Sequence, residues 1–486
     1  MNKNKNNSKK KKKVNIFSRI IGILFDILLI IFSGLIIYMD VLPTKYFSLV
    51  FSVIAIIAII INLILFIPKI KTKLKIPTNI FAILFSLVFI FGINYLYNTV
   101  DFLENITSSG YQVENYYVVV LDNETYFKLD DLKSYKMGFF NTDTDTYKKA
   151  KEKIEKKVET KNTDYKDHIK LANDLLNENV DAIFISESYK VNLDEEVTGF
   201  KDKTKILATI SIKTKTKSIA KEVKVTKEPF NIFISGIDTY GAISSVSRSD
   251  VNMIATVNPT THEILLTSIP RDYYVKLNGT TGLKDKLTHA GIYGVDKSVK
   301  TLEDLFEIEI NYYFRVNFTT LIDVVDVIGG IDVYSDKTFI PWTDPAITIK
   351  KGNVHMDGKT ALAFARERHA YQEGDRHRVK NQQDVLTAIM NKMLSSKTII
   401  SKYNSLLNTL DGSFQTNMAT KDLTSLIKNQ LNTMPKWNIT SQSVNGRDSS
   451  NYTYSYPSQK LYVMEPDMST VELAKTKIKE TLNNEK

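Results

Sequence analysis

The chain is 486 residues long, with 43% hydrophobic and 24% charged residues, so it has room for two or three domains with a sizeable core. The net charge of +10 would suit a nucleic-acid-binding protein, but residues 1–98 hold thirteen Lys and Arg against two Asp, a net charge of +11. The remaining residues, 99–486, therefore sum to −1, which argues against a basic nucleic-acid surface there. The lack of cysteine is compatible with an exported protein that uses no disulfides.

The N-terminal region has the pattern of a multi-pass membrane anchor. A basic tail, residues 1–19, precedes three apolar runs that we predict as transmembrane helices, residues 20–39, 48–67 and 80–97. Each run has about the 20 residues needed to cross the hydrocarbon core of a bilayer. Lysines are concentrated in the tail and in the loop between the second and third runs, and such lysine-rich segments stay cytoplasmic. We therefore expect a protein of the cell membrane whose residues 99–486 are extracellular.

One carboxyl group lies inside the first predicted span. A charged side chain within hydrocarbon is costly, and by default it suggests a functional site. Asp26 is also only about two helical turns from Arg19, so it can instead be solvated near the cytoplasmic surface of the membrane. The sequence leaves both interpretations open.

Residues 105–228 alternate short apolar segments with charged helical ones. The predicted strands are YYVVVL, KMGFF, DAIFIS and ILATISI, and the predicted helices are YKKAKEKIEKKVET and DHIKLANDLLNENV. A Lys- and Thr-rich stretch that ends at Pro229 is predicted as an edge strand followed by a linker. This pattern predicts a small extracellular α/β accessory domain without a cluster of catalytic residue types.

Residues 229–486 begin with an apolar segment, FNIFISGID, which is typical of a strand buried on both faces. Two further predicted strands follow, VNMIATV and ILLTSI. If the three run antiparallel, Asp238, Asp250 and Arg271 meet at one sheet edge, and such edges are where open α/β sheets bind ligands. Two carboxylates suit a hard cation such as Mg²⁺, and an arginine beside them suits a phosphate. Each aspartate taken alone can instead cap a turn.

The segment ARERHAYQEGDRHR concentrates arginines more than any surface charge pattern requires. A helix is expected over MDGKTALAFA, and Arg366 and Arg368 can converge on one ligand only if the backbone after it is extended. Asp375 is expected to cap a second helix on which Arg378 and Gln382 lie one turn apart, and the helix N-terminus favours an anion. The alternative is a surface ion-pair network among five residues: Arg366, Glu367, Arg368, Glu373 and Asp375.

Four stretches between residues 230 and 392 carry a specific pattern: FISGIDTYG…SRSDVNMIATVNPTTHEILLTSIPRDYYV, KLTHAGIYG, YYFRVNFTTLIDVVDVIGGIDV and GKTALAFARERHAYQEGDRHRVKNQQDVL. In content and order they resemble the LytR-CpsA-Psr family of Gram-positive cell-wall proteins, and the three spans with an accessory domain look like its capsule-associated CpsA branch. The resemblance implies an α/β fold: three N-terminal transmembrane helices, the small α/β accessory domain, and an α/β/α sandwich catalytic domain with a mixed central sheet and a lipid pocket.

The resemblance also implies an activity and a set of residues. Such proteins move a glycopolymer, of the capsular polysaccharide or wall teichoic acid type, from polyprenyl pyrophosphate to peptidoglycan, with Mg²⁺ as cofactor. The family's metal positions match Asp238 and Asp250. Its pyrophosphate-binding positions match Arg248, Arg271, Lys286, Arg366, Arg368, Arg378 and Gln382, and its catalytic positions match Arg271, Asp375, Arg366 and Arg368. Asp375 can serve as general base or can orient Arg378 and Arg366, and the segment FTTLIDVVDVIGGIDV can line the lipid pocket or belong to the ordinary core.

Rival functions need the same residues. A non-catalytic lipid-pyrophosphate binding protein and a pyrophosphatase both remain alternatives, because only the fate of the glycan separates them from a transferase. A transcriptional attenuator is disfavoured, since the predicted cytoplasmic parts are a short tail and one short loop. The expected partners are the polyprenyl-pyrophosphate-linked glycan, peptidoglycan, the cytoplasmic membrane and capsule-assembly membrane proteins, with no nucleic acid.

Overall fold

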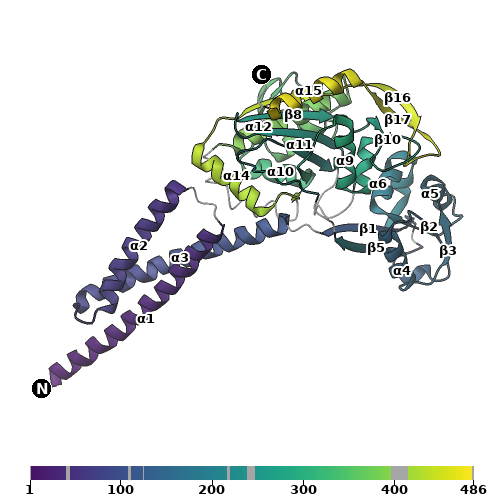
Figure 1. The fold of residues 1–486 in the computed structure, drawn as a ribbon. Helices are drawn as coiled ribbons and strands as arrows, with labels where there is room; N and C mark the ends of the chain where they lie inside the picture. The colour runs from purple at the N-terminus through teal and green to yellow at the C-terminus, as the bar shows by residue number, and fades with distance from the viewer. Residues whose placement is uncertain are drawn as a thin grey trace. The chain divides into compact units, whose positions relative to one another are not determined.

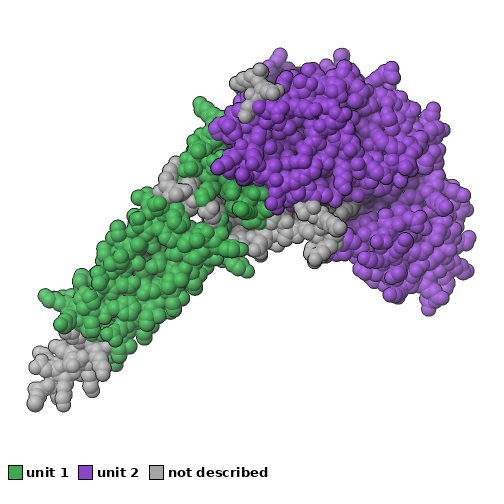
Figure 2. Space-filling view, viewed as in Figure 1, with its two compact units in different colours: residues 1–105, 394–408, 419–436 green, residues 106–393, 409–418, 437–486 purple. Residues whose placement is uncertain are grey.

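The computed structural model describes residues 2–39, 44–107, 111–123, 125–215, 219–237, 247–395 and 414–483. The chain divides into two compact units (Figure 2): residues 1–105, 394–408 and 419–436 form one, and residues 106–393, 409–418 and 437–486 form the other.

The first unit is built on three long helices, α1 (Asn2–Met39), α2 (Thr44–Phe66) and α3 (Thr72–Thr107), and it also includes α14 (Thr420–Thr433). In the described part of the chain, three helical segments are long and apolar enough to cross a membrane: Lys13–Met39, Tyr46–Phe66 and Thr72–Asn98. They contain nearly all of the three predicted spans, because a sustained apolar run forms a helix whose outward side chains need no aqueous partner.

Asp26 has a polar partner inside this helical unit. Asn62 of α2 donates a hydrogen bond from Nδ2 to Asp26 Oδ1 at 2.7 Å. Polar side chains on neighbouring membrane helices commonly satisfy one another in this way. The structure therefore ties the carboxyl group to a second helix, an arrangement that neither sequence interpretation included.

The accessory domain of the second unit contains a five-stranded sheet in the order β3-β2-β4-β1-β5. The strands are β1 (Tyr111–Leu121), β2 (Lys136–Phe140), β3 (Lys161–Tyr165), β4 (Ala182–Ser186) and β5 (Thr204–Lys215); the helices are α4 (Asp145–Glu155), α5 (His168–Leu176), α6 (Glu187–Glu196) and α7 (Phe200–Lys203). All four predicted strands and both predicted helices are present. Strand β3 was missed because its sequence, KNTDY, is polar and mostly exposed at the sheet edge.

The larger domain is organised around a six-stranded mixed sheet in the order β14-β11-β6-β7-β8-β15. Its strands are β6 (Phe230–Ile237), β7 (Val251–Asn258), β8 (Glu263–Ile269), β11 (Tyr312–Asn317), β14 (Phe414–Thr416) and β15 (Asn438–Ser443). As expected, β6, β7 and β8 are consecutive antiparallel strands. Strands β11 and β15 run parallel to their neighbours β6 and β8, which makes the sheet mixed.

Helices cover both faces of this sheet (Figure 1). Phe233 of β6 packs with residues of α9 (Val295–Phe306) and α15 (Met468–Asn483) in one hydrophobic cluster. The next residue, Ile234, points to the opposite face and lines a cavity together with residues of α10 (Phe318–Val327), α11 (Gly358–Arg366) and α12 (Asp375–Met393). The alternation of strand side chains thus produces the predicted α/β/α sandwich.

Shorter elements complete the domain. They are α8 (Leu287–Ala290) and three two-stranded sheets: β9 (Tyr274–Val275) with β10 (Asp285–Lys286), β12 (Ile331–Ser335) with β13 (Gly352–Met356), and β16 (Gly446–Tyr452) with β17 (Lys460–Pro466). Aromatic side chains join the accessory domain to the larger one. The ring of His168 lies 4.4 Å from that of Tyr456, and the hydroxyls of Tyr189 and Tyr293 are 3.3 Å apart.

Candidate functional site

An ion pair joins the ends of two strands at one edge of the large sheet. Because β7 and β8 are antiparallel, Asp250, just before β7, lies close to Arg271, just after β8. Arg271 Nη1 is 3.2 Å from Asp250 Oδ1, and Thr288 Oγ1 donates a hydrogen bond to the same oxygen at 3.2 Å. The predicted meeting of Asp250 and Arg271 is confirmed, whereas Asp238 lies outside the described residues.

Neighbouring guanidinium groups keep Asp250 ionised. Burial alone would raise the pKa of this carboxyl group, but Arg271, Arg248 and Arg378 together with the hydrogen bond from Thr288 outweigh it and lower the pKa to about 2. Asp250 therefore carries a full negative charge at neutral pH. A hard cation would find one anionic oxygen ligand here. Within the described residues, no cluster of three or more acidic, His or Cys side chains could hold a metal ion.

The backbone between Arg366 and Arg368 is extended, as the converging arginines require. Helix α11 begins after Asp357, whose side chain accepts from Thr360 N–H, and it ends at Arg366, where Glu367 adopts φ −70° and ψ 129°. Gly358 allows the first turn of α11 to approach α10, because a Cβ there would lie 2.2 Å from the carbonyl oxygen of Ile322.

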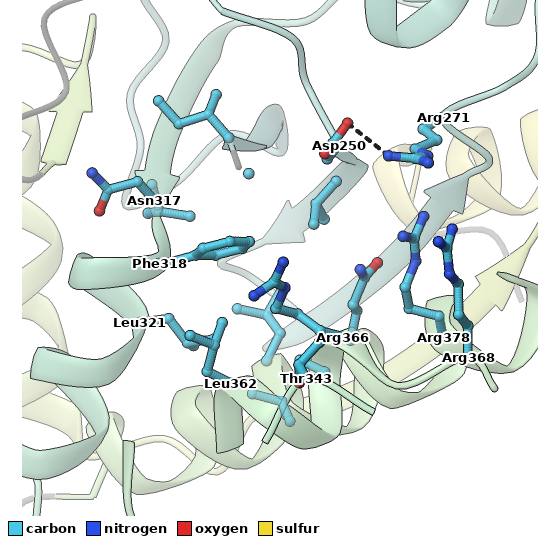
Figure 3. A pocket seen from close by; sticks show the side chains of 18 of the residues that line it. Asp250, Arg271, Asn317, Phe318, Leu321, Thr343, Leu362, Arg366, Arg368 and Arg378 are labelled. Atoms are coloured by element: carbon cyan, nitrogen blue, oxygen red, sulfur yellow. Dashed lines mark ion pairs between the residues drawn. The ribbon is translucent and has the colours of Figure 1, made fainter. Parts of the chain in front are cut away.

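The two arginines make different contacts. The guanidinium of Arg366 lies 4.2 Å from the ring centre of Phe318, and Arg368 Nε donates to His369 Nε2 at 3.3 Å. Both side chains line the same cavity (Figure 3).

A buried glutamate organises this segment, whereas the sequence analysis considered it only as a member of a surface ion-pair network. Glu367 is only 1% exposed, and its carboxyl oxygens accept three backbone hydrogen bonds. The donors are Trp342 N–H at 2.6 Å, His369 N–H at 2.6 Å and Ala370 N–H at 2.8 Å. Glu367 thereby fixes the chain between the two arginines and ties it to the loop that carries Trp342.

Helix α12 supplies Arg378 and Gln382. Asp375 is the first residue of this helix rather than a residue before it, and Arg378 Nη2 lies 2.7 Å from Asp375 Oδ1. Burial is the main cause that lowers the pKa of Arg378, and Arg271 and Arg368 lower it further, while Asp375 opposes the shift. The guanidinium groups of Arg271, Arg368 and Arg378 therefore repel one another, and a bound anion with several negative charges would relieve this repulsion.

The cavity has a volume of about 630 Å³ and two chemically different parts. Its polar lining includes Asp250, Arg271, Arg366, Arg368, Arg378 and Gln382, of which Figure 3 labels the aspartate and the four arginines. Its apolar lining includes Ile234, Met253, Val316, Phe318, Leu321, Leu362, Val385, Leu386 and Ile389. The segment considered as a pocket wall contributes at its start, through Phe318 and Leu321, whereas Val324 and Val325 are buried in the core.

Three of the predicted residues do not line this cavity. Lys286 Nζ lies 3.2 Å from Asp272 Oδ1, and Arg271 Nε is 3.5 Å from the other oxygen of Asp272, so Lys286 is linked to the site through an ion-pair chain. Arg248 is buried and helps to lower the pKa of Asp250. Asp375 is connected to the cavity by its ion pair with Arg378.

Arg376, to which no role was assigned, points elsewhere. Its guanidinium donates to Gly446 O at 2.9 Å and is half exposed. The cavity lining also includes residues that the sequence analysis did not single out, among them Trp342 and Glu196. Trp342 lies in a loop between β12 and β13, and Glu196 comes from the accessory domain, so no local motif could identify them.

Comparisons with known proteins place these residues in a family. The model of the LytR_cpsA_psr family matches residues 195–470. A relative from Bacillus cereus, named polyisoprenyl-teichoic acid–peptidoglycan teichoic acid transferase TagU, is 35% identical over 213 residues, which are 43% of this chain and 68% of that protein.

Two solved structures are also similar. One is Bacillus subtilis TagV, with 31% identity and a TM-score of 0.45 over 53% of this chain and 98% of that one. The other is TagT bound to LIIa-WTA, with 28% identity and a TM-score of 0.45 over 54% of this chain and 94% of that one. The family match extends over more than half of the chain and includes every described residue of the cavity. The chain belongs to the LytR-CpsA-Psr family.

Proposed function

We propose that this protein is a membrane-anchored phosphotransferase that moves a glycopolymer, of the capsular polysaccharide or wall teichoic acid type, from polyprenyl pyrophosphate to peptidoglycan. The observation that carries the proposal is the two-part cavity, with four arginines at its polar part and aliphatic side chains in the remainder. A polyprenyl pyrophosphate has the same two-part character, a multiply charged anion joined to a long apolar chain. The transferase name of the relative from Bacillus cereus supports the type of reaction.

In the proposed reaction, a peptidoglycan hydroxyl oxygen attacks the phosphorus that bears the glycan. The bond from this phosphorus to the bridging oxygen breaks, the polyprenyl phosphate leaves, and the hydroxyl proton is released. Arg271, Arg366, Arg368 and Arg378 would hold the pyrophosphate and stabilise the charge that develops on the leaving phosphate. Their planar guanidinium groups match pairs of phosphate oxygens.

Asp375 fits the role of a positioning residue better than that of a general base. Its carboxyl group is 2.7 Å from Arg378 Nη2, and it is outside the described lining of the cavity. A base must reach the proton that it removes. We therefore assign to Asp375 the orientation of Arg378 and leave the base unassigned.

Mg²⁺ fits the chemistry of the available donor, because Asp250 presents an ionised carboxylate beside the arginines. Asp250, with Asp238 as the second carboxylate, would hold the ion, which when bound would neutralise phosphate charge. We further propose that the soluble region is extracellular, since lysines flank the spans on the side predicted to be cytoplasmic.

The test follows the glycan. The full-length chain in lipid nanodiscs is mixed with a polyprenyl-pyrophosphate glycan labelled in its sugar and with peptidoglycan. Label on peptidoglycan supports the transferase; label released as a soluble sugar phosphate indicates a pyrophosphatase; label that stays on the lipid despite binding indicates a binding protein. The last two outcomes would each overturn the proposed reaction.

Variants sharpen this assay. Arg366→Lys and Arg368→Lys should each slow transfer by about tenfold or more, because a lysine loses one charge-assisted hydrogen bond of about 1.5–3 kcal/mol. Arg376→Lys is the matched control, since Arg376 belongs to the same segment but contacts Gly446 instead of lining the cavity. Equal transfer rates in all three variants would refute the arginine site.

A further inference from the structure

We propose that Trp342 is a binding platform for the sugar ring that directly follows the pyrophosphate. The inference rests on the proposed function and deepens it, because it assigns a residue to recognition of the glycan.

Trp342 is held next to the arginines. Its backbone N–H donates to Glu367 Oε2 at 2.6 Å, and Glu367 lies between Arg366 and Arg368 in the sequence. Its ring centre is 4.9 Å from that of His369. A pyrophosphate bound by these arginines would therefore bring its attached groups close to the indole.

The loop that presents Trp342 is internally bonded. Phe339 and Ile349 exchange two backbone hydrogen bonds of 2.9 Å and close the base of the loop. Inside it, Asp344 N–H donates to Pro341 O at 3.3 Å and Ile347 N–H donates to Asp344 O at 3.1 Å. The indole is thus displayed by an ordered loop rather than by an unstructured one.

The indole is open to solvent although it lines the cavity. Trp342 is 71% exposed, so most of its apolar area remains in water. Large exposed aromatic groups at a cavity are typical of ligand recognition. A sugar ring is a suitable partner, because its C–H face packs on an aromatic face while its hydroxyls stay at the edge, in contact with water and polar groups.

The position of Trp342 favours the glycan over the lipid. The residues suited to an isoprenoid chain, such as Leu321, Leu362 and Ile389, lie on helices that face the sheet inside the cavity. Trp342 instead is bonded to the segment that carries Arg366 and Arg368. Of the two groups attached to a pyrophosphate, the sugar is the one that remains when the lipid occupies the apolar part.

The experiment uses the fact that the sequence contains only two tryptophans, Trp342 and Trp437. In a Trp437→Phe variant of the full-length chain, reconstituted in lipid vesicles that contain no other protein, all tryptophan fluorescence comes from Trp342. We would titrate this protein with polyprenyl pyrophosphate that carries no sugar and with the same lipid that carries a disaccharide. A change in fluorescence is expected with the disaccharide-bearing lipid and not with the sugar-free one.

Affinity provides the second readout. Trp342→Ala should weaken binding of the disaccharide-bearing lipid by roughly tenfold and leave binding of the sugar-free lipid unchanged. Trp342→Phe keeps an aromatic ring and should weaken binding of the disaccharide-bearing lipid less. Tyr334→Ala is the matched control, since Tyr334 is an exposed aromatic residue, 56% accessible, outside the described cavity lining.

Three results would overturn the proposal. Equal weakening of both lipids would assign Trp342 to the phosphate or lipid part of the ligand. Quenching of Trp342 by brominated phospholipids without any ligand would assign it to the membrane surface. If wild-type protein binds neither polyprenyl pyrophosphate, the proposed function fails as well, whereas the first two results leave that function intact.

Discussion

Replacing the buried Glu367 by Gln tests whether one carboxyl group holds the arginine segment in place. Its Oε1 accepts from His369 and Ala370, and its Oε2 accepts from Trp342. Glutamine keeps one oxygen acceptor and puts an N–H₂ donor in the place of the other, so the amide orientation that keeps the bonds from His369 and Ala370 loses the bond from Trp342 N–H. Such charge-assisted bonds contribute about 1.5–3 kcal/mol each.

The loss should appear first as local opening. Amide hydrogen exchange in peptides that contain Trp342, measured by mass spectrometry, should become about tenfold to a hundredfold faster in Glu367→Gln, as that range of free energy implies. Transfer should slow too, because Arg366 and Arg368 flank the altered residue. Glu373→Gln is the control, since Glu373 is an exposed glutamate of the same segment. Unchanged exchange at Trp342 in Glu367→Gln would refute this account of how the segment is held.

Three further predictions concern charge, pH and topology. Asp250→Asn should lower transfer sharply and reduce the free energy of unfolding at neutral pH. The pKa of Asp250 is lowered from 3.8 to about 2, so the ionised carboxylate stabilises the fold fully above about pH 4. The difference in free energy of unfolding between wild type and Asp250→Asn, measured by urea titration, should therefore become smaller as the pH falls toward 2. A difference in free energy of unfolding that does not change with pH would contradict a stabilising ion pair at Asp250. Burial lowers the pKa of His168 from 6.5 to about 4, so between these pH values the unfolded chain binds a proton that the folded chain does not. The free energy of unfolding of the wild type should therefore fall by up to about 3 kcal/mol as the pH is lowered from 6.5 to 4. His168→Phe should remove this dependence, and an identical pH profile in the variant would exclude His168 as its source. Protease added to wall-stripped cells should digest residues 99–486, and protection of this region with digestion of the N-terminal tail would reverse the proposed topology.

Patterns that repeat along the chain were sufficient to predict most of the fold. Apolar runs predicted the three long helices, and apolar strand segments predicted β6, β7 and β8. The antiparallel order of the strands then placed Asp250 beside Arg271, because the start of β7 and the end of the antiparallel strand β8 lie at the same edge of the sheet. Spacing along the 366–378 segment likewise predicted an extended link and a following helix. These features depend on neighbours within a few residues, and their physical causes are therefore visible in the sequence.

Other features depend on partners that are distant in the chain. The polar strands β3 and β15 have no apolar alternation, and they become strands only because a sheet edge offers them unpaired backbone groups. Glu367 acquires its role from the Trp342 loop, and Glu196 reaches the cavity only through the packing of the accessory domain within its unit. The sequence by itself determined the membrane helices, the central strands and the arginines of the site. Only the tertiary structure decided which carboxyl group holds those arginines and which side chains surround them, because hydrogen bonds and packing between distant segments leave no periodic trace in the sequence.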